Sequence, residues 1–367
     1  MGNYDDCLSF FYEPGMEADL GSIKKIIPQW DRSADPKAGD FRIELIHCCA
    51  ENESGGFGTP FLRPDGQIGY QLPHKHVADE YYLFVGTDPD VNNWRDLGGT
   101  CELWLGDGQD MQRFDITTPS VARIPAGTYH MPFWVKNLRR NFLMITLPQT
   151  TILEDTCDAP VPAGIDYPDW AVELYKKNGM EIPEDAGTYN PEEHTKFTHL
   201  VNECYVPEMW ADVGVGSIPV MQWDTSCDPM APFRIEFVPL GVNDQSAGFG
   251  TPFLRPTGEI GYQLPHKHVC DEYYVFIGTD PDNWEDLGAE LELWLGEGED
   301  AQKFMLDKTC VVRIPAGTYH LPYRVHNCRR NFIMLAIPMA PILHDQSDGK
   351  LSPDIEYPDW VKEEDRK

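Results

Sequence analysis

The stretch from Gly55 to Asp90 reads GGFGTPFLRPDGQIGYQLPHKHVADEYYLFVGTDPD, and the stretch from Ala247 to Asp282 reads AGFGTPFLRPTGEIGYQLPHKHVCDEYYVFIGTDPD. Each copy contains HKH followed four residues later by a glutamate. Each is then followed by RIPAGTYH, which ends at His130 in the first copy and at His320 in the second. Because packing alone gives no reason to keep such ligand sets in register twice, metal binding is the first hypothesis.

The repeat extends well beyond these motifs. FRIELI begins at Phe41 and FRIEFV at Phe233, ELWLG occurs twice, and RRNF occurs twice. The repeating unit is therefore a domain of about 180 residues rather than a short solenoid repeat. A segment rich in Pro, Glu and Asp separates the copies from about residue 155 to 195. We predict an N-terminal domain with its linker at 1–187 and a C-terminal domain at 188–367.

The local patterns within each unit are short and extended. ELWLGDGQDMQRFDI and VARIPAGTYHMPFWV each read as two strands joined by a turn, and NFLMITLP reads as a buried strand. We expect an all-β fold, a sandwich or barrel of antiparallel strands, with a few short helices. One of these helices is expected to start at Asp169 and to end at Gly179.

Composition excludes several classes of protein. The formal charge of -31 repels phosphate and anionic lipid, and no basic cluster offsets it, so we expect no nucleic-acid and no membrane partner. The N-terminus has acids where a signal peptide needs bases, which favours a cytoplasmic location. Ten cysteines are present, but Cys101 matches Leu291 and Cys310 matches Ser120 in the other repeat. Reduced thiols therefore fit better than a disulfide framework.

Side chains alternate between the two faces of a strand, which places the candidate ligands together. His74 and His76 share one face of a strand, and Glu80 and Tyr82 return to that face if the strand continues without a bulge. A tight Pro-Ala-Gly turn can bring His130 in from a neighbouring strand. The second repeat offers the same set, namely His266, His268, Glu272, Tyr274 and His320. Three imidazoles and one carboxylate suit a divalent transition ion.

At these residues the chain resembles the cupin family, and its duplication resembles a bicupin. The resemblance rests on HKHVADE and HKHVCDE, each with PAGTYH, and it implies two tandem jelly-roll β-barrels. It implies one metal per domain, with Fe, Mn, Ni or Zn as candidates, held by His74, His76, Glu80 and His130 and by His266, His268, Glu272 and His320. The chain departs from the usual family pattern at Gly69 and Gly86, each one position closer to the ligands, so no single subfamily is indicated.

Other residues could act on a substrate. Tyr82 and Tyr274 share the predicted ligand face and could donate a proton or orient substrate, although packing of the wall explains them equally well. Arg63 and Arg255, in the matched FLRP segments, could clamp a carboxylate, or could pair with nearby acids.

The leading functional hypothesis is a metal-dependent bicupin enzyme that acts on a small anionic or phenolic molecule by oxygen-dependent cleavage, as a dioxygenase, or by decarboxylation. One alternative is a non-redox lyase or isomerase. An alternative from another class is a non-catalytic bicupin that binds or stores a small ligand around a structural metal. The sequence leaves the formation of a homo-oligomer open.

Overall fold

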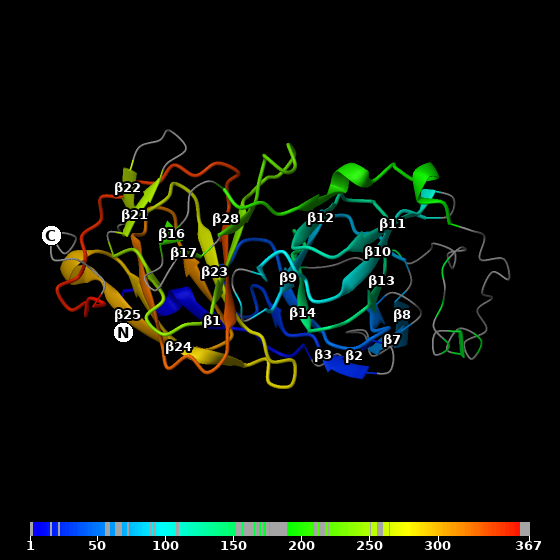
Figure 1. The fold of residues 1–367 in the computed structure, drawn as a ribbon, viewed down its shortest axis with the longest axis horizontal. Helices are drawn as coiled ribbons and strands as arrows, with labels where there is room; N and C mark the ends of the chain where they lie inside the picture. The colour runs from blue at the N-terminus through cyan, green and yellow to red at the C-terminus, as the bar shows by residue number, and fades with distance from the viewer. Residues whose placement is uncertain are drawn as a thin grey trace. The chain divides into compact units, whose positions relative to one another are not determined.

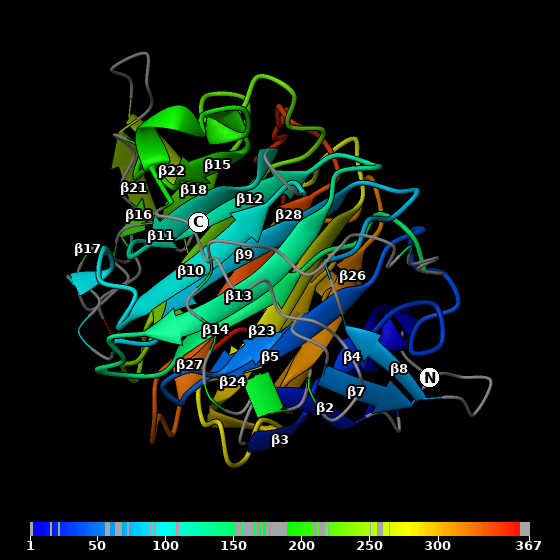
Figure 2. The same cartoon turned by 90° about the vertical axis from the view of Figure 1, so that its right-hand side faces the viewer.

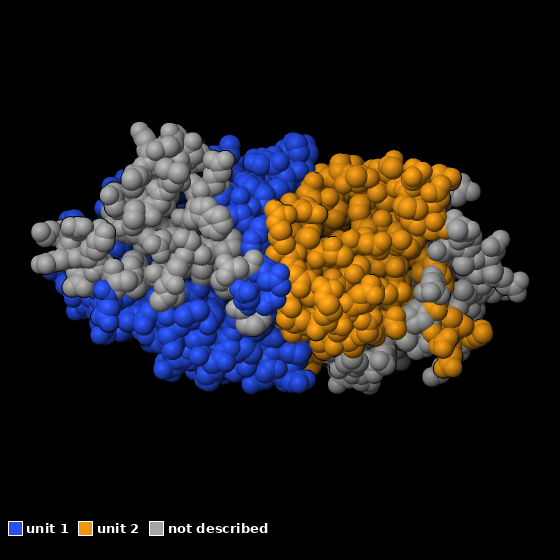
Figure 3. Space-filling view, in the orientation of Figure 1, with its two compact units in different colours: residues 1–11, 87–94, 204–367 blue, residues 12–86, 95–203 orange. Residues whose placement is uncertain are grey.

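The computed structural model describes residues 3–14, 17–20, 23–55, 59–62, 68–71, 73–88, 90, 93–107, 110–151, 156, 165, 167, 169, 172–173, 176, 189–207, 211–212, 217–218, 220–249, 251–254, 260–263 and 265–359 (Figure 1). The contacts of the chain define two compact units, coloured in Figure 3. The N-terminal unit consists of residues 12–86 and 95–203 and holds the first repeat. The C-terminal unit consists of residues 1–11, 87–94 and 204–367 and holds the second.

The N-terminal unit is built from antiparallel strands in two main sheets. The six-stranded sheet has the order β15 (Val201–Glu203), β12 (Ser120–Ile124), β9 (Glu80–Gly86), β14 (Phe142–Thr146), β5 (Ile43–Cys48) and β4 (Gln29–Trp30). The four-stranded sheet has the order β11 (Gln112–Ile116), β10 (Thr100–Leu105), β13 (His130–Lys136) and β6 (Ser54–Gly55). Two hairpins complete the unit: β2 (Glu17–Leu20) with β3 (Ile23–Ile26), and β7 (Thr59–Leu62) with β8 (Ile68–Gln71).

The C-terminal unit repeats this plan. Its six-stranded sheet has the order β1 (Leu8–Phe10), β26 (Cys310–Ile314), β23 (Glu272–Gly278), β28 (Phe332–Pro338), β19 (Ile235–Leu240) and β18 (Met221–Trp223). Its four-stranded sheet has the order β20 (Ser246–Ala247), β27 (His320–His326), β24 (Asp286–Leu295) and β25 (Gln302–Lys308). The hairpins are β16 (Ala211–Asp212) with β17 (Ser217–Ile218), and β21 (Thr251–Leu254) with β22 (Ile260–Gln263).

Helical structure within the described residues is confined to short 3-10 turns and to residues 169, 172–173 and 176, which are α-helical. These turns are η1 (Asp5–Cys7), η4 (Pro191–Glu193), η5 (Thr198–Leu200) and η6 (Gly298–Asp300). None of the described helices is long and apolar enough to cross a bilayer. The helix predicted from residue 169 to 179 falls largely outside the described residues. The predicted all-β class, two jelly-roll barrels with few short helices, is confirmed.

Alternation along the strands places one face of each large sheet toward the barrel interior. In the N-terminal unit, Tyr82 and Phe84 of β9 pack in one cluster with Leu103 and Phe133 of the four-stranded sheet. Strands β12, β9 and β14 run side by side in Figure 2, so their matching positions line the same interior. Full burial of each such side chain stabilises the fold by about 1.5–3 kcal/mol.

The segment that precedes each repeat adds an edge strand to the barrel of the other repeat. β1, from the start of the chain, pairs with β26 so that Leu8 faces Val312. β15, which precedes the second repeat, pairs with β12 so that Val201 faces Ala122. Each compact unit is therefore made of more than one segment of the chain. The boundary expected between residues 187 and 188 stays a prediction. The nine described cysteines are free thiols.

Candidate metal centre

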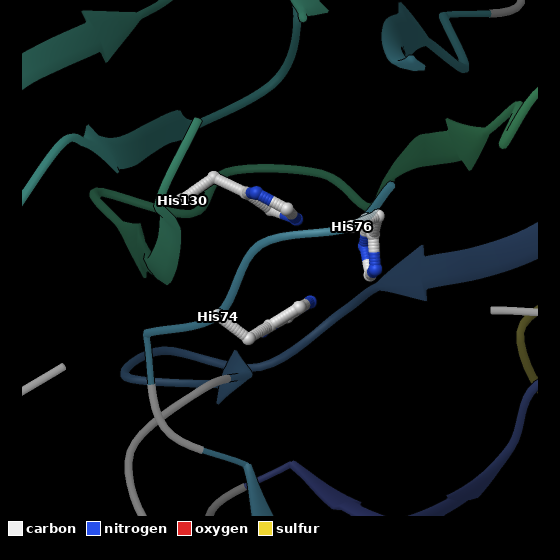
Figure 4. Close-up of side chains that lie close together, drawn as sticks. All are labelled: His74, His76 and His130. Atoms are coloured by element: carbon white, nitrogen blue, oxygen red, sulfur yellow. The ribbon is translucent and has the colours of Figure 1, made fainter. Parts of the chain in front are cut away.

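Three histidine rings of the N-terminal unit point toward one another, as Figure 4 shows. The ring centroids of His74 and His130 lie 4.4 Å apart, and the ring centroid of His76 lies 4.8 Å from each of them. All three side chains are buried, His130 completely. Their ligand nitrogens lie within 4.8 Å of one another, so the histidines expected from the HKH and PAGTYH motifs do come together.

Glu80 joins this group from the first position of β9. Its Oε2 lies 3.2 Å from Nε2 of His76 and 3.1 Å from Nε2 of His130. Burial alone would raise the pKa of Glu80, but the contacts with His130 and His76 outweigh burial and hold the pKa well below its ordinary value. The carboxylate is therefore ionised at neutral pH, as a metal ligand must be.

The C-terminal unit has the same arrangement. The ring centroids of His266 and His320 lie 4.2 Å apart. The ring centroid of His268 lies 4.8 Å from that of His266 and 5.0 Å from that of His320. Oε2 of Glu272 lies 3.3 Å from Nε2 of His268 and 3.0 Å from Nε2 of His320. The two sets of four side chains therefore match in both composition and spacing.

The contacts within the C-terminal set favour a shared ion over direct hydrogen bonding. Nε2 of His268, Nε2 of His320 and Oε2 of Glu272 are all buried, and their mutual contacts lack hydrogen-bond geometry. Two ligands bound side by side on one ion, each about 2.1 Å from it, lie about 3 Å apart. The observed separations of 3.0 and 3.3 Å fit this spacing, so these residues fit a divalent transition ion.

The last histidine of each set is oriented by the backbone around it. Nδ1 of His130 lies 3.0 Å from the carbonyl oxygen of Thr128, and Nδ1 of His320 lies 3.1 Å from that of Thr318. A protonated Nδ1 can donate to that carbonyl, which leaves Nε2 as the inward-facing lone pair. The backbones of His74 and His130 also exchange two hydrogen bonds, of 3.1 and 2.9 Å, which join the two motifs directly.

The Pro-Ala-Gly turn is tied to the HKH segment by two contacts. The backbone N–H of Gly127 donates to the carbonyl of His76 at 2.8 Å, and Gly127 has a φ of 80°, which favours glycine. The N–H of Ala126 donates to Oδ1 of Asp79 at 2.8 Å, and Asp271 holds Ala316 in the same way. Asp79 and Asp271 therefore position the turn that delivers the last histidine.

A further carboxylate lies beside the C-terminal set. Oδ1 of Asp345 lies 3.0 Å from Nδ1 of His268. Burial would lower the pKa of His268, but the contacts with Asp345 and Glu272 outweigh it and raise the pKa to about 9. Burial and the neighbouring imidazoles lower the pKa of His266 to about 3, so that ring is neutral near pH 7. In the first repeat the residue matching Asp345 is residue 155, outside the described part of the chain.

The two predicted tyrosines pack beside the ligand sets. Tyr82 and Tyr274 are buried beside the last histidines, with ring centroids 5.8 Å from His130 and 5.6 Å from His320. Burial, followed by the charge of Glu272, raises the pKa of Tyr274 well above its usual range. Its phenol therefore stays protonated.

Tyr129 and Tyr319, which directly precede the last histidines, contact lysines instead. Nζ of Lys75 donates to the Tyr129 hydroxyl at 2.8 Å, and Lys267 lies 4.3 Å above the Tyr319 ring. The lysine between the two histidines points away from the ligand face, as strand parity predicts. Arg63 and Arg255 lie outside the described residues, so their expected role stays a prediction.

Sequence reasoning missed an arginine and a glutamate in each unit. Nη1 of Arg42 donates to Glu44 at 3.2 Å, and Nη1 of Arg234 donates to Glu236 at 3.0 Å. Both pairs come from the matched FRIE motif, where arginine and glutamate alternate with apolar residues. That alternation could have indicated two polar side chains on one face of a strand. It could not have shown which strand lies beside it.

Solved structures resemble the chain over most of its length. The formate complex of Lactobacillus farciminis oxalate decarboxylase matches with a TM-score of 0.52 and 10% identity, covering 92% of this chain and 88% of that chain. A mutant of Bacillus subtilis oxalate decarboxylase matches with a TM-score of 0.51 and 10% identity, covering 92% and 79%. No protein-family model and no curated protein matches the sequence. The protein has the bicupin fold, with one candidate three-histidine metal site in each unit.

Proposed function

We propose that the protein is a metal-dependent bicupin enzyme that decarboxylates a small dicarboxylate, with oxalate as the first compound to test. The observation that carries the proposal is the duplicated set of three buried histidines and one ionised glutamate. In each unit these side chains approach to ligand spacing around a common point. The fold shared with two oxalate decarboxylases supports the choice of reaction.

The charge of the proposed centre selects an anion. Three neutral imidazoles and one carboxylate leave a net charge of about +1 on a bound divalent ion. A divalent ion held there would polarise a bound carboxylate and stabilise negative charge that develops on it. In a protein with a formal charge of -31, this is a local positive position to which a small anion can bind.

The chain's own side chains supply the rest of the site. Tyr82 and Tyr274 cover the last histidines with aromatic rings and exclude water from that side. Glu44 and Glu236 lie on strands two places across the sheet from the ligand glutamates and face the same interior.

The test uses chelator-treated protein reloaded separately with Mn, Fe, Ni or Zn. Oxalate is added, and carbon dioxide, formate and dissolved oxygen are followed together. We expect equal amounts of carbon dioxide and formate without net oxygen consumption. A matched control is the double variant Glu80→Gln with Glu272→Gln, which should lose both metal and turnover.

Other outcomes would replace the proposal. Oxygen uptake with catechols would assign a dioxygenase, and turnover of other carboxylates without oxygen would indicate lyase or isomerase chemistry. Tight metal binding with no turnover of any of these compounds would favour ligand storage.

A further inference from the structure

The backbone of the C-terminal HKH motif is held from two sides. The motif lies outside the regular strands, and His266 and Lys267 form isolated bridges. On one side, His266 exchanges hydrogen bonds of 3.2 and 3.0 Å with His320 of β27. On the other side, Lys267 exchanges hydrogen bonds of 3.2 and 3.1 Å with Gln346, which lies beyond the end of β28. Backbone groups of successive residues in an extended segment point to opposite sides, so the two neighbours support the motif separately.

Residues 345–350, with the sequence DQSDGK, form a strap that contacts both ligand motifs of the C-terminal unit. The backbone N–H of Gly349 donates to the carbonyl oxygen of Pro265, just before HKH, at 3.0 Å. The hydroxyl of Tyr319, just before the last histidine, donates to Oδ1 of Asp348 at 2.7 Å. The strap therefore ties the HKH motif to the PAGTYH motif.

The far end of the strap is fixed to the loop that follows β24. The backbone N–H of Lys350 donates to Oε2 of Glu297 at 3.0 Å, and its carbonyl oxygen accepts from the N–H of Gly298 at 2.8 Å. Hydrogen bonds at both ends and along its length hold the strap in one position.

Position 349 of the strap is too crowded for a side chain. Gly349 is buried, and a Cβ atom added to it would lie 2.5 Å from the carbonyl oxygen of Pro265 and 2.6 Å from Cδ1 of Tyr319. Glycine is the residue that allows such a close approach of the backbone. An alanine at this position would therefore push the strap away from the two ligand motifs.

The strap separates a buried ligand from solvent. Oδ1 of Asp345, the first residue of the strap, lies 3.0 Å from Nδ1 of His268. The side chain of Asp345 is 49% exposed, whereas that of His268 is only 3% exposed. Gln346, Asp348 and Lys350 are exposed as well, so little apolar surface holds the strap down. Segments with few buried apolar contacts open locally at low cost in free energy.

The four ligands of this site differ in how firmly the backbone holds them. Glu272 begins β23 and His320 begins β27, and each of these strands has a paired strand on both sides. His266 and His268 lie outside the strands and depend on the bridges to β27 and to the strap. An ion can leave only when its ligands separate. The HKH motif is therefore the part of the ligand set that has to move.

We propose that the strap controls how fast the C-terminal site gains and loses its ion. While the strap is closed, Lys267 is fixed and the two histidines beside it stay in place. When the strap opens, one side of the HKH motif is freed, and His266 and His268 move away from Glu272 and His320 together. The inference rests on the metal binding in the proposed function and is independent of the reaction.

The first experiment measures ion exchange in the His130→Ala protein, which lacks a complete N-terminal ligand set. Mn release is followed after addition of excess chelator, and Mn loading is followed after mixing with metal-free protein. We expect Gly349→Ala to raise both rates about tenfold or more, because the variant removes at least one backbone hydrogen bond of the closed strap. The affinity should change less than either rate. Unchanged rates, or faster release with slower loading, would overturn the proposal.

The matched control is Gly349→Ala in the His320→Ala protein, which keeps a complete ligand set only in the N-terminal unit. Exchange at that site should change less than about twofold, and a change as large as at the C-terminal site would overturn the proposal. A milder variant, Asp348→Ala, removes the acceptor of the Tyr319 hydroxyl from an exposed position. In the His130→Ala protein it should raise both rates about threefold. No rise in this variant would contradict the role of the strap.

Hydrogen exchange of the metal-free native protein tests the opening of the strap without any ion. The amides of Lys267, Gln346 and Gly349 donate between the strap and the HKH segment. We expect them to exchange together, at least about 100-fold faster than the amides of β23. Equal protection of Lys267 and β23 would overturn the proposal. None of these measurements uses oxalate, so a failure to decarboxylate it would count against the proposed function alone.

Discussion

The two metal-site regions share their ligand geometry and differ in the wall beside it. The distances from Glu80 to its two histidines, 3.2 and 3.1 Å, nearly equal the 3.3 and 3.0 Å of Glu272. One strand away, Thr146 donates to Glu44, whereas Ala336 at the matching position cannot donate to Glu236. The barrel backbone sets the ligand geometry, because the ligand glutamate stands at the first position of a strand and a tight turn precedes the last histidine. Hydrogen bonds from the neighbouring strand can change independently and alter the chemistry of each site.

Removing one histidine should have the largest effect, and it tests whether the two sites are independent. His130→Ala should abolish binding at the N-terminal site and lower the metal content from about two ions per chain to about one, because three ligands hold the ion far less tightly than four. His320→Ala should do the same at the other site. Elemental analysis after dialysis measures both. Loss of both ions in either single variant would show that the sites are coupled.

The second largest effect should be a dependence of metal affinity on pH. We expect it at the C-terminal site only. The pKa of His268 is raised to about 9, so below pH 9 metal must displace a proton from that ring. Affinity at this site should rise about tenfold per pH unit up to about pH 9 and then level off. A competing chelator titrated against the His130→Ala protein, which keeps only this site, gives the slope.

The raised pKa of His268 also makes the stability of the metal-free protein depend on pH. This stability should fall as pH rises, whereas metal affinity should increase. A histidine whose pKa is higher in the folded than in the unfolded state stabilises the fold fully below its unfolded pKa of about 6.5. That contribution is lost as pH rises through 9. Thermal unfolding of metal-free protein should therefore show lower stability at pH 9 than at pH 6.5. Asp345→Asn should flatten both slopes, and an unchanged slope in that variant would contradict the role given to Asp345.

The smallest effect is expected at the turn, where the two units should behave alike. Asp79→Ala removes the acceptor of the Ala126 N–H, and Asp271→Ala removes that of Ala316. The loss of one hydrogen bond costs about 1 kcal/mol, which corresponds to a drop in Tm of about 2–4 °C for a unit of this size. Scanning calorimetry of the two variants provides the comparison. A much larger drop in one of them would mean that the turns are not equivalent.

Much of the site could be predicted because its signals are local. HKH does bring His74 and His76 into one ligand set, but the strand expected from His74 to Tyr82 is interrupted: His74 forms only an isolated bridge with His130, and β9 begins at Glu80. The Pro-Ala-Gly turn has Gly127 at a positive φ. Lys75 points away to Tyr129, as parity predicts. The repeat supplied the second site without further argument.

What could not be predicted depends on strand order and on distant segments. The row from Glu236 through Ala336 to Tyr274 exists because β28 lies between β19 and β23, and no pattern within one strand reveals this order. Asp345 reaches His268 from 77 residues further along the chain. The pairing of β1 with β26 joins segments about 300 residues apart, and hydrophobic alternation shows that a strand exists but not where it pairs.

The central claim is that each barrel holds one ion between three histidines and one glutamate. Crystals of Mn-loaded protein, measured for anomalous scattering at the metal edge, test this claim most directly. We expect two peaks per chain, one within about 2.0–2.3 Å of His74, His76, His130 and Glu80, and the other equally close to the matching set in the second repeat. Peaks that lie elsewhere, or none at full loading, would contradict it.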